Sequence, residues 1–354
     1  MNQDKYERLA AFLDSLPAGF PRTESGVELR ILKKLFTEEQ AVLACHLNMW
    51  PEPVEKIAER AQKSAGEIAD ALYEMSCKGL IFRADRPDGP MYMAAQYVIG
   101  IWEYHVNDLD EELIKDMNEY IPALFDVMTG IKTQQLRTIP IGATLEGQGV
   151  VMPYEDARKL IENQRKILVA PCICRKEHTM VGKGCGKLMD ACLVFSSGAY
   201  FYEKKGIGRS ITKEEALNIL RQAEEQGLVL QPSNAQKIMN ICLCCGDCCQ
   251  VLKSIKRHQN PAQIVHSNYY SKVRDEDCIG CETCLERCQM DAIQMKGDVA
   301  VIDLNRCIGC GLCAPACVAH AIDLVRKDEK DCYVPPAYID ETYMRIAQER
   351  GLIK

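Results

Sequence analysis

Cysteine is the residue type with the strongest chemical signal in this sequence. Of its 20 cysteines, 17 lie between Cys172 and Cys317. Clustered thiols form disulfides in small secreted domains, whereas in a chain of 354 residues without a secretory signal they bind metal. The N-terminal residues carry early acidic side chains and no continuous apolar stretch, so we expect no such signal. We therefore expect a cytoplasmic protein whose reduced thiols bind metal.

Eight of the cysteines form two copies of the spacing C-x2-C-x2-C-x3-C. The copies are Cys278, Cys281, Cys284 and Cys288, and then Cys307, Cys310, Cys313 and Cys317. They lie 29 positions apart (307 − 278), and the same shift carries Ala292 and Ile293 onto Ala321 and Ile322. Three thiolates at this spacing can wrap one four-iron cube, and nearby glycines allow close approach of the backbone. The spacing predicts two [4Fe-4S] clusters.

This segment resembles the bacterial two-cluster ferredoxins, and the likeness covers roughly residues 270–330. In that family the fourth cysteine of each run ligates the other cluster. The resemblance therefore implies two crossed sites, one of Cys278, Cys281, Cys284 and Cys317, the other of Cys307, Cys310, Cys313 and Cys288. The family usually has proline after the fourth cysteine, where this chain has Gln289 and Val318. That departure affects local stiffness and not the number of ligands.

A second group of nine cysteines lies in residues 172–249. They are Cys172, Cys174, Cys185, Cys192, Cys242, Cys244, Cys245, Cys248 and Cys249. Ionised thiolates this crowded repel one another unless a cation lies among them. We expect one or two further iron–sulfur clusters here. Zinc is the alternative, because Cys245 and Cys248 form a C-x2-C pair. His178 could replace a thiolate, although we expect it in a surface loop.

The remaining pattern predicts a multidomain α+β protein. Capping boxes at Thr37 and Ser64 begin two helices of a winged-helix-like region. The expected order is a helical, winged-helix-like domain (1–97), a connector (98–165), a cysteine-rich metal-binding domain (166–255), a two-cluster ferredoxin domain (270–330) and a C-terminal tail helix (331–354).

Smaller features complete this interpretation. Residues 135–141 are predicted to form a strand, and Thr212 is predicted to cap a helix between the two sets of middle-domain cysteines. This folded insertion would bring the two sets together as sides of one site. Gly206 and Gly208 do not continue into a dinucleotide-binding motif. The isolated cysteines Cys45, Cys77 and Cys332 are expected to pack in the core.

The chain also resembles uncharacterised multi-cluster iron–sulfur proteins that join such a cysteine-rich region to a terminal ferredoxin module. That resemblance names no reaction. The two predicted ferredoxin clusters and the further cysteines indicate an electron-transfer protein, or the electron-transfer subunit of a larger anaerobic redox complex, with a redox protein or a larger oxidoreductase complex as partner. The alternatives are a redox-responsive winged-helix regulator and a reductase with a substrate-reducing cluster in the middle domain. No catalytic residue can be identified from spacing alone.

Charge and hydropathy exclude some partners. The net charge is −7, and residues 37–97 carry ten acidic side chains against six Lys and Arg. This balance argues against nucleic acid, because phosphate binding needs basic side chains, and it favours a winged-helix-like region that docks onto a protein. No apolar run approaches the ~18 residues that a membrane span needs.

Overall fold

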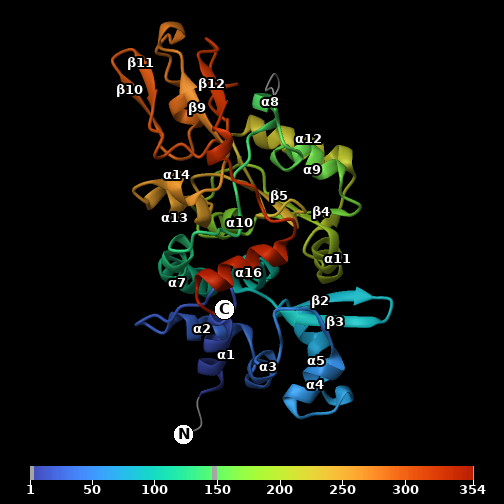
Figure 1. The fold of residues 1–354 in the computed structure, drawn as a ribbon. Helices are drawn as coiled ribbons and strands as arrows, with labels where there is room; N and C mark the ends of the chain where they lie inside the picture. Colours follow the sequence, from blue (N-terminus) through green and yellow to red (C-terminus); the bar gives the residue numbers. More distant parts are fainter. Residues whose placement is uncertain (1–3, 146–149, 354) are drawn as a thin grey trace. The chain divides into compact units, whose positions relative to one another are not determined.

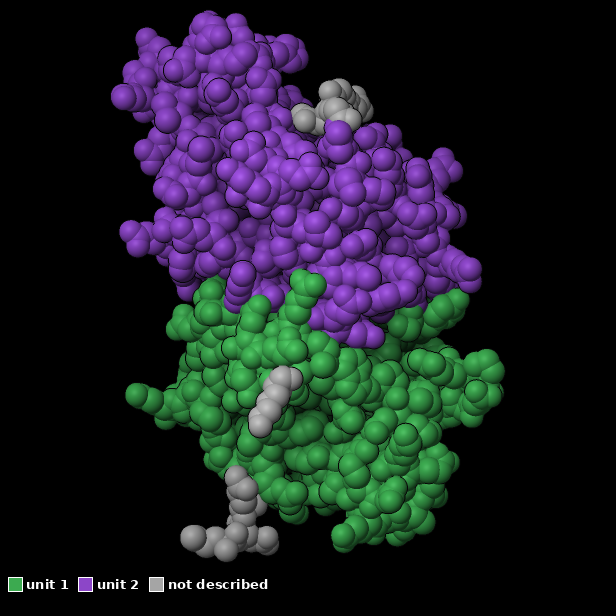
Figure 2. Space-filling model, viewed as in Figure 1, with its two compact units in different colours: residues 1–131, 197–209, 343–354 green, residues 132–196, 210–342 purple. Residues whose placement is uncertain are grey.

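The computed structural model describes residues 4–145 and 150–353. The chain divides into two compact units, coloured separately in Figure 2. Unit 1 comprises residues 1–131, 197–209 and 343–354, and unit 2 comprises residues 132–196 and 210–342. Both helices and sheets occur (Figure 1), so the predicted α+β class is confirmed. Within the described ranges, no helix is both long and apolar enough to cross a membrane.

Unit 1 is mainly helical and contains one small sheet. Its helices are α1 (Lys5–Asp14), α2 (Val27–Leu35), α3 (Glu38–Ala44), α4 (Val54–Ala61), α5 (Ala65–Lys78), α6 (Trp102–Tyr104), α7 (Glu111–Thr129) and most of α11 (Ser196–Lys205), with the irregular turn η1 (Tyr97–Ile101) before α6. The strands β1 (Glu52–Pro53), β2 (Ile81–Arg86) and β3 (Gly89–Ala94) form an antiparallel sheet in the order β1-β3-β2. The C-terminal helix α16 (Ile339–Glu349) starts in unit 2 and ends in unit 1.

Two helices of unit 1 begin at the capping boxes that the sequence predicts. The side chains of Thr37 and Ser64 accept hydrogen bonds from backbone amides, and both capping boxes are complete. Gly79 ends α5 in the left-handed conformation with a φ of 84°. Glycine has no Cβ to oppose that conformation, so this residue is a common helix terminator.

The centre of unit 2 is a five-stranded sheet in the order β6-β4-β5-β8-β7. Its strands are β4 (Ile167–Pro171), β5 (Asp190–Phe195), β6 (Arg209–Ser210), β7 (Val229–Pro232) and β8 (Asn240–Cys244). The pairs β4–β5, β5–β8 and β7–β8 are antiparallel. The helices of this part are α8 (Gly142–Leu145), η2 (Pro153–Glu155), α9 (Ala157–Glu162), α10 (Ile173–Met180), α12 (Lys213–Glu225), α13 (Gln250–Arg257) and α14 (Pro261–Ile264). Thr212 caps α12 through its side chain, as predicted.

Residues 135–141 do not form the predicted strand. Only two isolated bridges occur there, from Leu136 to Ser233 and from Ile139 to Leu230. The alternation of apolar residues reflects burial, because Leu136, Ile139 and Ile141 are all buried. The segment runs as an extended chain beside β7 without a continuous ladder.

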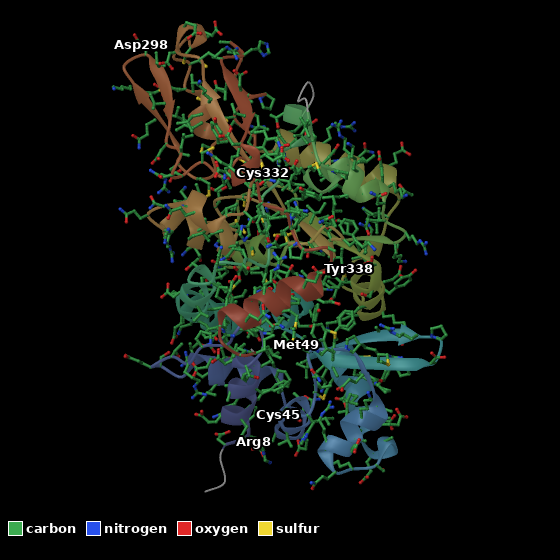
Figure 3. The ribbon with its side chains drawn as sticks, viewed as in Figure 1. Arg8, Cys45, Met49, Asp298, Cys332 and Tyr338 are labelled. Atoms are coloured by element: carbon green, nitrogen blue, oxygen red, sulfur yellow. The ribbon has the colours of Figure 1, made fainter. Side chains whose placement is uncertain are left out.

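The C-terminal part of unit 2 is built from two similar halves. Its elements are β9 (Tyr269–Val273), η3 (Asp275–Asp277), α15 (Thr283–Arg287), β10 (Ile293–Lys296), β11 (Val299–Ile302), β12 (Ile322–Arg326) and η4 (Glu329–Asp331). Strand β9 pairs with β12 and β10 pairs with β11, both antiparallel. A shift of 29 residues relates β9 to β11 and β10 to β12, so the repeat in the sequence becomes a structural repeat. The β10–β11 hairpin turns at Asp298, which is labelled in Figure 3.

One hydrophobic core joins the sheet to the C-terminal part. It includes Leu193 and Ile241 of the sheet together with Ile308 and Leu312 of the second cysteine run. Cys288, Cys307 and Cys310 pack against this core. The cysteine-rich sheet and the second ferredoxin-like loop therefore share one core.

Candidate metal centres

The first cavity of the C-terminal part is surrounded by four cysteines from both halves of the repeat. They are Cys278, Cys281, Cys284 and Cys317. The other walls include the apolar side chains of Val273, Met295 and Ile322. Three thiols therefore come from one run and the fourth comes from the other.

The second cavity has the complementary composition. It is lined by Cys288, Cys307, Cys310 and Cys313, and Ile293, Ile302 and Leu312 supply apolar walls. Four thiols around a cavity with apolar walls are the donor set that a four-iron cluster takes. The residues present thus fit one such cluster in each cavity.

Backbone amides point at the thiols in a pattern that follows the repeat. The amide of Ala292 donates to Cys288 Sγ at 3.2 Å, and the amide of Ala321, 29 residues later, donates to Cys317 Sγ at 3.3 Å. Likewise, the amide of Ser271 donates to Cys307 Sγ at 3.4 Å, and that of Ala300 donates to Cys278 Sγ at 3.5 Å. Such donors stabilise thiolate charge and tune the reduction potential of a bound cluster.

Burial controls the protonation of several of these thiols. Burial raises the pKa of the Cys313 thiol to about 12, although the Ser271 hydroxyl opposes the shift. Burial also raises the pKa of Cys310 well above its usual value. At the exposed end, hydrogen bonds from Thr283 lower the pKa of Cys281. Metal binding must therefore displace protons from the inner thiols.

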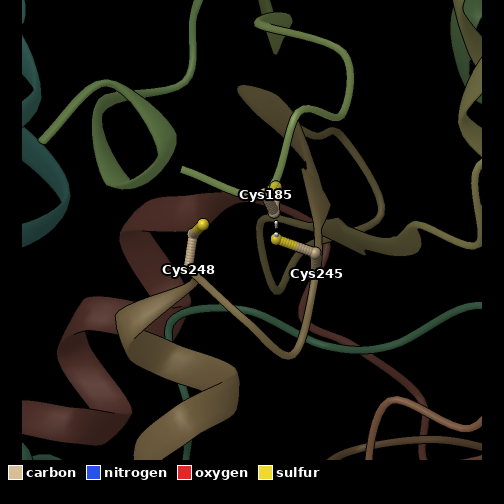
Figure 4. A group of neighbouring side chains, drawn as sticks. All are labelled: Cys185, Cys245 and Cys248. Carbon is tan, nitrogen blue, oxygen red and sulfur yellow. Dashed lines mark hydrogen bonds between the residues drawn. The ribbon is translucent and has the colours of Figure 1, made fainter. Parts of the chain in front are cut away.

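The nine cysteines of the middle region separate into two groups. Cys185, Cys245 and Cys248 form a three-thiol group whose sulfurs all lie within 4.8 Å of one another (Figure 4). The other six form a chain of neighbouring thiols in the order Cys172, Cys174, Cys249, Cys244, Cys242 and Cys192. Sequence spacing alone did not predict this division.

Two helices begin at the six-thiol group. Cys172 is the N-cap of α10 and Cys249 is the N-cap of α13. Hydrogen bonds from Cys174 and Cys244 lower the pKa of Cys249, helped by backbone amides of Leu252 and Val251. The N-terminal end of a helix attracts negative charge, so these two helices favour an anionic group among the six thiols.

Arg175 is a buried residue of the candidate site that sequence reasoning missed. Its guanidinium is buried and donates to the carbonyl oxygens of Leu188 at 2.8 Å and Leu243 at 2.6 Å. Burial lowers the pKa of Arg175, but the negative potential of Cys172 and Cys245 outweighs it and raises the pKa overall. A buried guanidinium between the two groups offsets part of their thiolate charge. The sequence signal was its position one residue after Cys174.

Several isolated residues differ from expectation. His178 lies on α10 and is 9% exposed, so the predicted surface loop is wrong. Its Nδ1 is 2.8 Å from the Cys174 carbonyl oxygen and its Nε2 is 3.2 Å from Lys253 Nζ. Cys77 is exposed on α5, so the predicted core position is wrong. Its side chain lies outside the face of the helix that carries the buried residues. Cys45, at the end of α3, and Cys332, after η4, are half-buried, so the predicted core position holds only in part for them. Figure 3 labels both residues.

Gln289, where the ferredoxin family usually has proline, connects the two cysteine-rich regions. Its Oε1 accepts a hydrogen bond of 2.6 Å from the backbone amide of Gly246. Cys288 precedes Gln289 and Cys245 precedes Gly246. The contact is close, because a Cβ on Gly246 would lie 2.7 Å from the Gln289 carbonyl oxygen. The side chain that replaces proline thus holds the loops together.

Replacing Gln289 by proline is expected to lower the stability of unit 2 by about 1 kcal/mol, because the Gly246 amide loses its acceptor. Iron content should not change, since the thiols stay in place. Anaerobic urea denaturation, compared with that of Val318→Pro at the equivalent exposed position, measures the effect. Equal midpoints for the two variants would contradict this role of Gln289.

Comparison with known proteins agrees with the geometry of the C-terminal part. Residues 277–321 match the family described as the 4Fe-4S dicluster domain. Comparison with curated proteins and with solved structures found no match to the chain. The match supports a ferredoxin-like iron–sulfur region, which we call the dicluster domain, and electron transfer through it implies a redox partner.

Proposed function

We propose that this chain is an iron–sulfur electron-transfer protein, or the electron-transfer subunit of a larger anaerobic redox complex. The carrying observation is the arrangement of eight thiols as two quartets, each around its own cavity. Two four-iron clusters held by these quartets would pass single electrons. The crossed origin of each quartet keeps the two sites in one rigid module, which favours transfer between them.

The residues of the chain have distinct roles in this proposal. Cys278, Cys281, Cys284 and Cys317 hold one cluster, and Cys288, Cys307, Cys310 and Cys313 hold the other. The backbone amides of the repeated halves stabilise the thiolate charge. Exposed Cys281 marks the side at which a partner protein can approach the first cavity.

The six-thiol group is proposed to hold a further iron–sulfur cluster. Six thiols are more than one cube needs, and two helix N-termini and buried Arg175 compensate their charge. This group shares a hydrophobic core with the second cavity of the dicluster domain. Electrons could therefore pass between them without crossing solvent.

We further propose that residues 1–97 form a winged helix that docks this electron-transfer protein onto a partner protein. The helices α3, α4 and α5 are followed by the β2–β3 hairpin, and β1 completes the sheet. The excess of acidic side chains in residues 37–97 suits a basic protein surface better than DNA. The division into a connector (98–165), a metal-binding domain (166–255), the ferredoxin domain (270–330) and a tail (331–354) belongs to the same proposal.

Crossed ligation is tested by replacing cysteines one at a time with alanine in the anaerobically purified chain. Cys278→Ala and Cys317→Ala should each remove about four irons and abolish the same EPR signal of the reduced protein. Cys307→Ala should abolish the other signal, and Cys332→Ala is the matched control.

Two results would count against this proposal. If Cys317→Ala abolishes the signal that Cys307→Ala abolishes, ligation is not crossed. If the unmodified chain carries well under about eight irons, the two-cluster interpretation itself fails.

A further inference from the structure

The spacing of the three-thiol group suits one metal ion. Cys185 Sγ and Cys245 Sγ lie 3.8 Å apart, and Cys248 Sγ lies within 4.8 Å of both. A tetrahedral zinc ion with Zn–S bonds of about 2.3 Å holds its sulfurs about 3.8 Å apart. The group therefore has nearly the dimensions of three corners of a zinc–thiolate tetrahedron.

The cluster-type thiols of the same molecule are spaced differently. In the part of the chain that the structure describes, these three residues are the one set of three or more potential ligands within 4.8 Å of one another. The sulfurs of each quartet of the dicluster domain lie farther apart, as a cube requires, because each of its cysteines binds a different iron. The closer spacing of the three-thiol group therefore favours a single metal ion over a cluster.

Backbone amides donate hydrogen bonds to all three sulfurs. The amide of Lys187 donates to Cys185, that of Cys248 donates to Cys245, and that of Cys185 donates to Cys248. The two loops are also tied by an ion pair of 3.1 Å between Lys187 Nζ and Asp247 Oδ2. This arrangement holds the thiols together from both sides.

From this geometry we propose that Cys185, Cys245 and Cys248 bind one zinc ion whose fourth ligand does not come from the residues that the structure describes. The cations beside the sulfurs, Arg175 and Lys187, cannot ligate it. The neighbouring carboxylate, Asp247, pairs with Lys187 and lies outside the set of ligand atoms within 4.8 Å of one another. Structural zinc sites have four protein ligands, whereas three-ligand sites keep a position for water or substrate. The inference does not depend on the electron-transfer function.

The chemistry of the fourth ligand follows from its surroundings. Three thiolates on Zn²⁺ leave a net charge of −1, which buried Arg175 offsets. Cys185 is half-buried whereas Cys245 and Cys248 are buried, so exchange with solvent would take place on the Cys185 side. Because zinc is borderline-soft, the site would hold water and exchange it for a small thiol.

Metal analysis of the full chain, purified anaerobically, tests the site. We expect about one zinc per chain, reduced at least tenfold in Cys185→Ser and unchanged in the matched control Cys77→Ser. Iron and the EPR signals of the dicluster domain, measured in the same samples, should not change. A loss of about four irons in Cys185→Ser would overturn the proposal in favour of a cluster.

Cobalt(II) substitution of the unmodified chain gives a test that does not rely on a variant. Intense absorption of tetrahedral cobalt–thiolate, shifted on addition of 2-mercaptoethanol, is the expected result. Absence of the absorption would overturn the zinc site, and an absorption that does not shift would overturn the open fourth position. If the unmodified chain contains zinc but shows no EPR signals after reduction, that result would instead contradict the electron-transfer function.

Discussion

Replacing Gly309 by alanine is expected to remove the second cluster site of the dicluster domain. Gly309 has a φ of +66°, and a Cβ there would lie 2.1 Å from the Tyr269 carbonyl oxygen and 2.6 Å from Ser267 Oγ. The left-handed conformation costs an alanine about 1–2 kcal/mol, and the overlap with backbone adds about 1–3 kcal/mol. The loop between Cys307 and Cys310 must then move away from β9.

The measurement is iron per chain together with the EPR spectrum of the reduced protein. Gly309→Ala should lose about four irons and the signal that Cys307→Ala abolishes. Gly297→Ala is the matched control, because Gly297 has a φ of +65° but no atom within 4 Å of its Cβ position. If both variants retain their iron, close approach at Gly309 is not needed for cluster binding.

The surroundings of Gly309 show which features of the repeat could be predicted from the sequence and which could not. The repeat of 29 residues predicted both cysteine runs and the glycines beside them, because cluster loops impose strict local spacing. It could not show that Gly280 and Gly309 face the carbonyl oxygens of Asp298 and Tyr269. These two contacts are also related by the repeat, but each joins a cysteine loop to a segment that only the folded chain brings beside it.

The middle region was less predictable for a physical reason. Its nine thiols come from two segments separated by a folded insertion, and the partners of several depend on the register of the sheet. Cys192 and Cys242 face each other because β5 and β8 pair at these residues. Cys244 and Cys245 are adjacent in sequence but belong to different groups. Cys244 is the last residue of β8 and Cys245 follows the strand, so sequence proximity was a poor guide there.

Buried polar residues were also missed, because their partners lie far away in the sequence. Glu155, on η2, accepts hydrogen bonds from Asn268 Nδ2 at 2.6 Å, Tyr269 Oη at 3.1 Å and Arg326 Nη1 at 2.6 Å. Its side chain is 4% exposed. A polar network of this kind ties the segment before the sheet to β9 and β12. It anchors the dicluster domain to the rest of unit 2.

Removing the cation from that network is therefore expected to destabilise unit 2. Arg326→Met leaves the Glu155 carboxylate buried with two neutral donors, and breaking a buried pair costs about 3–5 kcal/mol. We expect about 2–3 kcal/mol, because Arg326 is partly exposed and the bonds from Asn268 and Tyr269 remain. Anaerobic urea denaturation followed by circular dichroism measures the loss.

Arg274→Met is the matched control, at the opposite end of the β9–β12 ladder. Arg274 pairs with Asp277 and Asp323, and all three side chains are more than a third exposed. Solvent and salt weaken such pairs. This variant should therefore unfold at the same urea concentration as the unmodified chain. Added salt should not restore Arg326→Met, because the Glu155 carboxylate lies out of reach of solvent ions. Equal stabilities of the two variants would mean that Glu155 does not hold the dicluster domain in place.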